Sequence, residues 1–140
     1  MKKYFKIALM LFSLLFSLSG CLFSDDPIDE DGLLITGRAE CYVSRFDLLG
    51  TDFVTVHLRE RMAEIDTVAC TIRVEVKYGT DLRNVYPQFH LVTDAKLEPK
   101  ITGFTDFSDL ANPKQYTVVS GNRKVRKTYT IYITEQQFIP

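Results

Sequence analysis

Hydrophobic and polar residues alternate along much of the 140-residue chain, from Tyr42 onward. In "CTIRVEVKY", for example, Ile72, Val74 and Val76 alternate with charged or polar neighbours. A period of two is typical of a strand with one buried face, because successive side chains point to opposite sides of a sheet. The segments that predict strands are "YVSRFDLL" at 42–49, "DFVTVHL" at 52–58, "CTIRVEVKY" at 70–78, "YPQFHLV" at 86–92, "KQYTVV" at 114–119 and "KTYTIYIT" at 127–134.

Short turn sequences, "YGTD", "ANP" and "SGN", separate these segments, and helical leanings are confined to "RERMAEI" at 59–65. About seven short strands without a long amphipathic helix predict an all-β fold, an antiparallel sandwich. The expected core consists of Phe46, Ile72, Val74, Val76, Phe89, Tyr116, Val118, Tyr129, Ile131 and Ile133.

The first twenty residues have the layout of a secretory signal peptide. A basic start, "MKKYFK", precedes an uncharged apolar run from Ile7 to Leu18. This run is shorter than the roughly 20 residues that a membrane-spanning helix needs. Leu18 to Cys21, "LSGC", resembles the lipobox of bacterial lipoproteins, which implies that Cys21 carries the lipid anchor. Several acyl chains together would hold the mature chain to a membrane.

An acidic segment follows Cys21, with five carboxylates and no basic residue up to Gly32. Such a run predicts a solvated, disordered tether. It also resembles the acidic export signal of Bacteroidetes-type surface lipoproteins, which implies an outer-membrane lipoprotein displayed at the cell surface. The predicted organisation is therefore a signal peptide at 1–20, a tether at 21–32 and one domain at 33–140.

Charge and cysteine content narrow the possible partners. Without residues 1–20 the chain has 14 basic and 18 acidic residues, and from Gly32 onward 14 basic and 13 acidic ones. A nearly neutral domain lacks the basic face that nucleic-acid binding needs, so no nucleic-acid partner is expected.

Cys41 and Cys70 are not expected to form a disulfide. In the alternating pattern, Cys41 is out of phase with the buried positions of its strand, whereas Cys70 is in phase with those of its own strand, which favours two unpaired thiols.

The order of segments resembles a known family. "VEVKYGTDLRNVYPQFHLVTDAKLEP" and "DFSDLANPKQYTVVSGNRKVRKTYTIYIT" are similar to the Ig-like domain of unknown function in Bacteroidetes-type surface lipoproteins. The resemblance covers about Tyr42 to Thr134 and implies an Ig-like β-sandwich without indicating an activity. The segment from Gly50 to Asp66 is longer than the usual link in that family, and we expect it to cover a sheet edge or to meet a partner.

Catalytic and metal-binding patterns are absent from the sequence. His57 and His90 lie on predicted strands and belong to no nucleophile–base motif. Asp106 and Asp109 in "DFSDLANP" supply too few oxygens for calcium and are expected to bond nearby backbone N–H groups. We therefore predict a non-enzymatic protein without a cofactor or a metal.

The candidate binding residues fall into three groups. The first is the charged turn of the 50–66 segment, and the second is the basic hairpin "NRKVRK". The third consists of two tyrosines suited to stacking on a sugar. We predict a module that presents a binding or scaffolding surface in the cell envelope, with an envelope protein or a glycan as its partner, and the alternative is an accessory glycan-binding lipoprotein that captures polysaccharide. The residues are Arg59, Glu60 and Arg61; Arg123, Lys124, Arg126 and Lys127; and Tyr86 and Tyr132.

Overall fold

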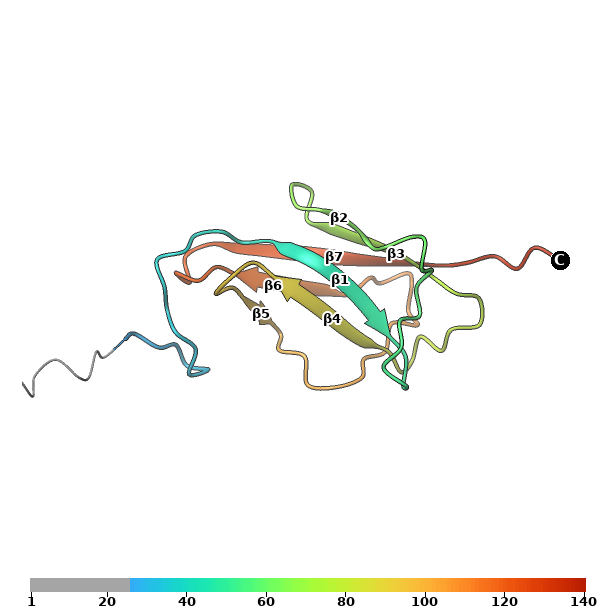
Figure 1. Ribbon diagram of the computed structural model, residues 1–140, viewed down its shortest axis with the longest axis horizontal. Coiled ribbons are helices and arrows are strands. Elements are labelled where there is room, and N and C mark those ends of the chain that lie inside the picture. The colour runs from blue at the N-terminus through green and yellow to red at the C-terminus, as the bar shows by residue number, and fades with distance from the viewer. Residues whose placement is uncertain (1–25) are drawn as a thin grey trace, which may run out of the picture.

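The computed structural model describes residues 26–140, and these form an all-β domain with seven strands (Figure 1). Residues 1–25, which include Cys21, lie outside the described part. The strands are β1 (Val43–Leu49), β2 (Glu64–Asp66), β3 (Thr71–Val76), β4 (Tyr86–Leu91), β5 (Lys96–Glu98), β6 (Gln115–Val119) and β7 (Arg126–Glu135).

The strands form two sheets that pack as a β-sandwich. One sheet contains β1 and β4, and the other contains five strands in the order β2-β3-β7-β6-β5. All pairs are antiparallel except β3 and β7, which run parallel with Ile72 opposite Ile131. The predicted all-β sandwich is confirmed, and the parallel β3–β7 pair departs from the predicted antiparallel arrangement. β4 and β5 each lie at the end of their sheet, so one side of the sandwich is bounded by these two strands.

The core has the composition that the alternation predicts. Every residue of the predicted core is buried except Phe89, which is partly buried against the others. Ile72, Val74 and Val76 of β3 face inward because their phase is the opposite of that of Arg73 and Glu75. The core also contains residues outside the regular alternation, including Cys41, Leu82, Val85 and Phe107.

The segment before β2 differs from the prediction. Residues 52–58 form no strand of their own but pair with both sheets through isolated bridges at Thr55 and His57. The Val56 N–H donates to the Leu48 carbonyl at 2.9 Å, and the Val56 carbonyl accepts from the Lys77 N–H at 2.9 Å. The segment thus closes one edge of the sandwich. Residues 59–65 form a turn and the start of β2 rather than a helix: Ile65 pairs with Ile72 of β3, and Ala63 and Ile65 pack against the core while Met62 is exposed.

The acidic segment is ordered where the structure describes it. Residues 27–36 form a small hairpin, in which the Ile35 N–H donates to the Pro27 carbonyl at 2.7 Å and Ile28 bridges Leu34. This hairpin lies at the end of the sandwich opposite the C-terminus (Figure 1). The composition predicts a disordered tether, but two cations of the sandwich bind the hairpin, as described below.

Both cysteines of the domain carry free thiols. Cys41 is buried, and its Sγ donates to the Val118 carbonyl at 3.1 Å, whereas Cys70 is partly exposed. The described residues contain no helix suited to crossing a membrane.

Candidate functional site

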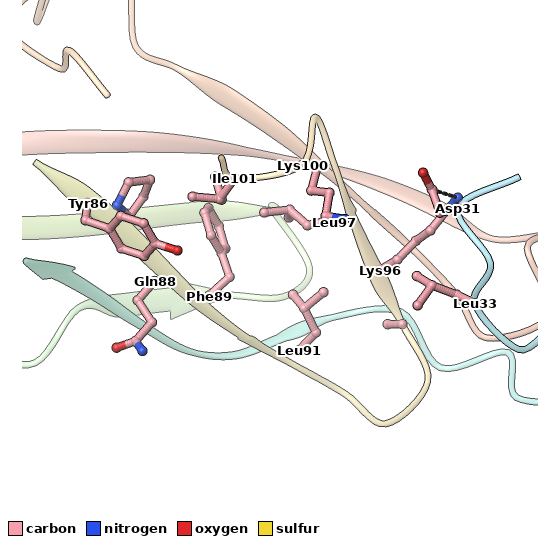
Figure 2. A pocket seen from close by; sticks show the side chains of 12 residues that line it. Asp31, Leu33, Tyr86, Gln88, Phe89, Leu91, Lys96, Leu97, Lys100 and Ile101 are labelled. Carbon is pink, nitrogen blue, oxygen red and sulfur yellow. Dashed lines mark hydrogen bonds and ion pairs between the residues drawn. The ribbon is translucent and has the colours of Figure 1, made fainter. Parts of the chain in front are cut away.

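A groove of about 350 Å³ runs along the side of the sandwich that β4 and β5 bound. Its floor is apolar and consists of Phe89, Leu91, Leu97 and Ile101. Figure 2 shows Tyr86 at one end of the groove and the Asp31–Lys96 pair at the other, with the apolar floor between them. Cavities that bind small molecules start at about 300 Å³ and combine apolar walls with a few polar groups, as this groove does.

Three aromatic rings gather at the Tyr86 end, and we call them the aromatic cluster: Phe53, Tyr86 and Phe104. The ring centroids lie 5.8 Å apart for Phe53 and Tyr86, 5.4 Å for Phe53 and Phe104, and 6.1 Å for Tyr86 and Phe104. Phe53 is 61% exposed and Phe104 is 45% exposed. Aromatic side chains gain free energy when they are buried, so a group of them exposed together is unusual. Such patches mark binding surfaces.

The backbone holds Phe53 in an unfavourable conformation. Its φ is +58°, in the left-handed region that a bulky side chain rarely adopts. A tight turn imposes this angle, since the Gly50 carbonyl accepts from the Phe53 N–H at 2.9 Å and the Gly50 N–H donates to the Val54 carbonyl at 2.9 Å. Strained residues persist where the surrounding structure fixes them, and they concentrate at functional sites.

The opposite end of the groove is polar. The Lys96 ammonium is almost fully buried and lies 2.8 Å from Asp31 Oδ2 and 3.0 Å from Asp29 Oδ2. Hydrogen bonding to Asp31, and then to Asp29, raises the pKa of Lys96 despite burial. Burial raises the pKa of Asp29, but hydrogen bonds from the Leu33 N–H, Lys96 and Arg123 outweigh it and hold the pKa well below its usual range. These charges are therefore paired at neutral pH.

A second buried polar cluster lies on the outer face of the β1–β4 sheet. The Asp47 carboxylate is 3.2 Å from His57 Nε2 and 2.7 Å from Arg45 Nε, and His90 Nε2 lies 3.6 Å away. His57 Nδ1 lies 3.2 Å from the Leu58 carbonyl. Both ring nitrogens of His57 thus face oxygen atoms, those of the Asp47 carboxylate and the Leu58 carbonyl. The contact between Asp47 and His57 fixes the 50–58 segment to β1.

This cluster predicts that acid destabilises the protein. Burial raises the pKa of Asp47, but hydrogen bonds from Arg45 and His57 lower it more, so its pKa lies below the usual range. A carboxyl with a lowered folded-state pKa stabilises the fold above its unfolded-state pKa of about 3.9 and loses this contribution as the pH falls further. We expect the midpoint of thermal unfolding to decrease between pH 5 and pH 2, within a range of about 3 pH units. Asp47→Asn should show a shallower decrease, and equal slopes would contradict the assignment.

The family model described as "SGBP, N-terminal", the N-terminal domain of surface glycan-binding proteins, matches residues 53–133. This match covers more than half of the chain and includes the whole aromatic cluster. The chain belongs to the SGBP N-terminal family. The match supports the predicted relation to Bacteroidetes surface proteins, and it starts after the acidic hairpin. A comparison with curated proteins found no match.

Two solved structures from Bacteroides share the fold of this SGBP N-terminal domain. A candidate glycoside hydrolase from Bacteroides thetaiotaomicron is 25% identical with a TM-score of 0.57, and the alignment covers 72% of this chain and 26% of that chain. A DUF4623 family protein from Bacteroides eggerthii is 14% identical with a TM-score of 0.51, covering 71% and 22%. The SGBP N-terminal chain thus spans about a quarter of the length of each solved protein.

The basic hairpin of the SGBP N-terminal domain does not present four equivalent cations. Arg123 is largely buried, with Nε 3.0 Å from Asp29 Oδ2 and with Nη1 donating to the Ser120 carbonyl at 2.9 Å. Arg126 pairs with Glu98, Lys127 is half-buried, and Lys124 is exposed. The structure thus assigns Arg123 and Arg126 intramolecular partners.

The other predicted residues lie apart from the aromatic cluster, except Tyr86. Arg59, Glu60 and Arg61 are exposed and line a separate hollow, where Arg61 Nη1 lies 2.5 Å from Glu75 Oε2. The Tyr132 ring lies beneath the Arg73 guanidinium, with 5.0 Å between the guanidinium carbon and the ring centroid.

Sequence reasoning missed most of the groove. Phe53 and Phe104 lie in irregular segments about 50 residues apart in the SGBP N-terminal domain, and only the fold brings them to Tyr86. Lys96 lies in an unpredicted strand. The one available signal for the polar end is the acidic run itself, since a buried lysine needs carboxylate partners.

Proposed function

We propose that this protein is a lipid-anchored, non-enzymatic module of the bacterial cell surface that binds a glycan at the groove. The observation that carries the proposal is the aromatic cluster, in which the exposed rings of Phe53 and Phe104 and the partly exposed ring of Tyr86 lie together beside an open groove. Membership of a surface glycan-binding family supports it. Of the two functions that the sequence left open, scaffolding and glycan capture, the gathering of exposed aromatics on one side favours glycan capture.

The chemistry of the groove suits a sugar chain. Sugar rings have apolar C–H faces and hydroxyl edges, so they need flat apolar surfaces together with a few hydrogen-bonding groups. Phe53 and Phe104 offer exposed ring faces, and the strained turn at Phe53 keeps its ring outside the core. Gln88 and Lys100 also line the groove and supply hydrogen-bonding groups.

The acidic groups favour binding over hydrolysis. Most glycoside hydrolases use a pair of carboxyl groups that flank the scissile bond. Among the described residues that line the groove, Asp31 is the only carboxylate, and it pairs with Lys96. Asp47 is buried and bound by Arg45 and His57, which gives it a structural role.

The N-terminal residues would attach the protein to the membrane. We infer that the signal peptide ends at Gly20, that Cys21 carries the lipid, and that residues 21–32 link the anchor to an Ig-like sandwich at the outer-membrane surface. The supporting observations are the lipobox-like "LSGC" and the family of surface proteins.

Replacing Cys21 with serine is expected to abolish lipid attachment, because the sulfur is the group that receives the diacylglycerol in a lipobox. Metabolic labelling with a radioactive fatty acid and membrane fractionation should show an unlabelled, uncleaved or soluble product. Cys70→Ser serves as the matched control and should label normally. Unchanged labelling and membrane partition of the Cys21 variant would contradict the anchor.

Replacing Phe53 with alanine is expected to weaken glycan binding by about tenfold or more, because an exposed aromatic anchor is lost. Affinity gel electrophoresis against a panel of soluble polysaccharides measures this effect for the domain without its signal peptide. Phe138→Ala removes an equally exposed phenylalanine outside the cluster, 68% exposed beside Tyr78, and should not change binding. Equal retention of both variants, or no retention of the wild type by any polysaccharide, would contradict the proposal.

A further inference from the structure

The acidic hairpin, residues 27–36, is a built element rather than a loose extension of the sandwich. Asp29 organises it, since its Oδ1 accepts hydrogen bonds from the Asp31 N–H at 3.0 Å and the Leu33 N–H at 2.9 Å. The Asp29 N–H in turn donates to the Leu33 carbonyl at 2.9 Å. These bonds give the hairpin a defined shape.

Two cations of the sandwich hold the hairpin through the same carboxylate. Asp29 Oδ2 lies 3.0 Å from Lys96 Nζ and 3.0 Å from Arg123 Nε, and its side chain is 4% exposed. Arg123 also donates to the Leu34 carbonyl at 3.1 Å, and the Thr36 N–H donates to the Gly121 carbonyl at 2.9 Å. Breaking such a buried pair by removing one partner leaves an uncompensated charge, so the hairpin is bound firmly.

The bound hairpin forms part of the groove. Asp31 and Leu33 line it together with Lys96, at the end opposite Tyr86 (Figure 2). Asp31 Oδ2 accepts from Lys96, whereas its Oδ1 makes no hydrogen bond to any other described residue. Lys96 is already surrounded by Asp29, Glu30, Asp31 and Glu98, all within 3.6 Å. This end of the groove therefore offers a free acceptor rather than a free donor.

We propose that the acidic hairpin is one wall of the glycan-binding groove and that Asp31 accepts hydrogen bonds from the hydroxyls of an uncharged sugar chain. The inference rests on the proposed function and adds its ligand class and a second contact. Hydroxyl donors complement the free carboxylate oxygen, whereas a uronate would meet an acceptor there. Because the hairpin shapes the site, glycan binding and the docked hairpin stabilise each other.

Three variants with the same change of charge separate the roles of the hairpin. Asp31→Asn removes the charged acceptor, Asp29→Asn weakens the attachment of the hairpin, and Glu30→Gln is the control, since Glu30 is 84% exposed and does not line the groove. The probes are soluble β-glucan, xylan and galactomannan as uncharged chains and polygalacturonate as the charged one. Calorimetry measures affinity, and hydrogen exchange of the Thr36 amide, which donates to the Gly121 carbonyl of the sandwich, reports whether the hairpin is docked.

We expect Asp31→Asn to lower affinity for the uncharged probe about tenfold, because it loses a charge-assisted hydrogen bond, with Thr36 exchange unchanged. Asp29→Asn should accelerate Thr36 exchange and weaken binding, and Glu30→Gln should do neither. If the wild type binds while the Asp31 and Asp29 variants match Glu30→Gln, or if polygalacturonate is the preferred probe, the inference is overturned and the proposed function stands. If the wild type binds none of the probes, both are overturned.

Discussion

Replacing Ile72 with alanine is expected to lower the free energy of unfolding by about 2–5 kcal/mol. Ile72 is fully buried on β3, an inner strand of the larger sheet, where it lies opposite Ile131 of β7 and Ile65 of β2. The substitution leaves a cavity that close-packed neighbours fill only partly. Urea denaturation, followed by tyrosine fluorescence or circular dichroism, measures the change.

The neighbouring residue provides the control. Arg73 points away from the core and covers the exposed face of Tyr132, so Arg73→Ala should change the free energy of unfolding by no more than about 0.5 kcal/mol. Similar losses for the two substitutions would mean that the two faces of β3 are assigned wrongly.

Replacing Asp47 with alanine is expected to destabilise the protein by about 1–3 kcal/mol, as loss of the partner of a buried hydrogen-bonding group does. The side chains of Asp47 and His57 are only 3% and 7% exposed, so the buried His57 Nε2 would lose its hydrogen-bond partner. The loss should also loosen the 50–58 segment that holds Phe53, since His57 is its buried attachment to β1.

A double-mutant cycle tests the pairing. His57→Leu in the Asp47→Ala background removes the buried ring nitrogen that has lost its partner, so it should restore part of the lost stability. Strictly additive losses would show that the two side chains do not depend on each other, contrary to the geometry.

Local pattern predicts the long strands but not the short ones. β3 and β7 are recognisable because Ile72, Val74, Ile131 and Ile133 alternate with polar residues over enough positions to define a phase. β2 and β5 have three residues each, too few to show a period. The 52–58 segment alternates like a strand, yet it pairs with both sheets through single bridges, because each sheet offers it only a short free edge.

The groove depends on contacts that a sequence does not display. Tyr86 could be selected from its place on a predicted strand, but its partners Phe53 and Phe104 lie in loops whose positions follow from the packing of the sandwich. The sequence predicts a tether for the acidic segment because no basic residue lies near its carboxylates along the chain. Lys96, some 65 residues later, supplies the pairing that orders it.

The most direct test of glycan binding at the groove is nuclear magnetic resonance mapping of the bound sugar. The isotopically labelled domain would be titrated with a short oligosaccharide cut from the polysaccharide that retains it most strongly. Binding at the groove should produce saturable shifts at Phe53, Tyr86 and Phe104 that extend along Phe89 and Leu97 toward Asp31. Saturable shifts confined to another surface, such as Arg73 and Tyr132 on the larger sheet, would contradict it.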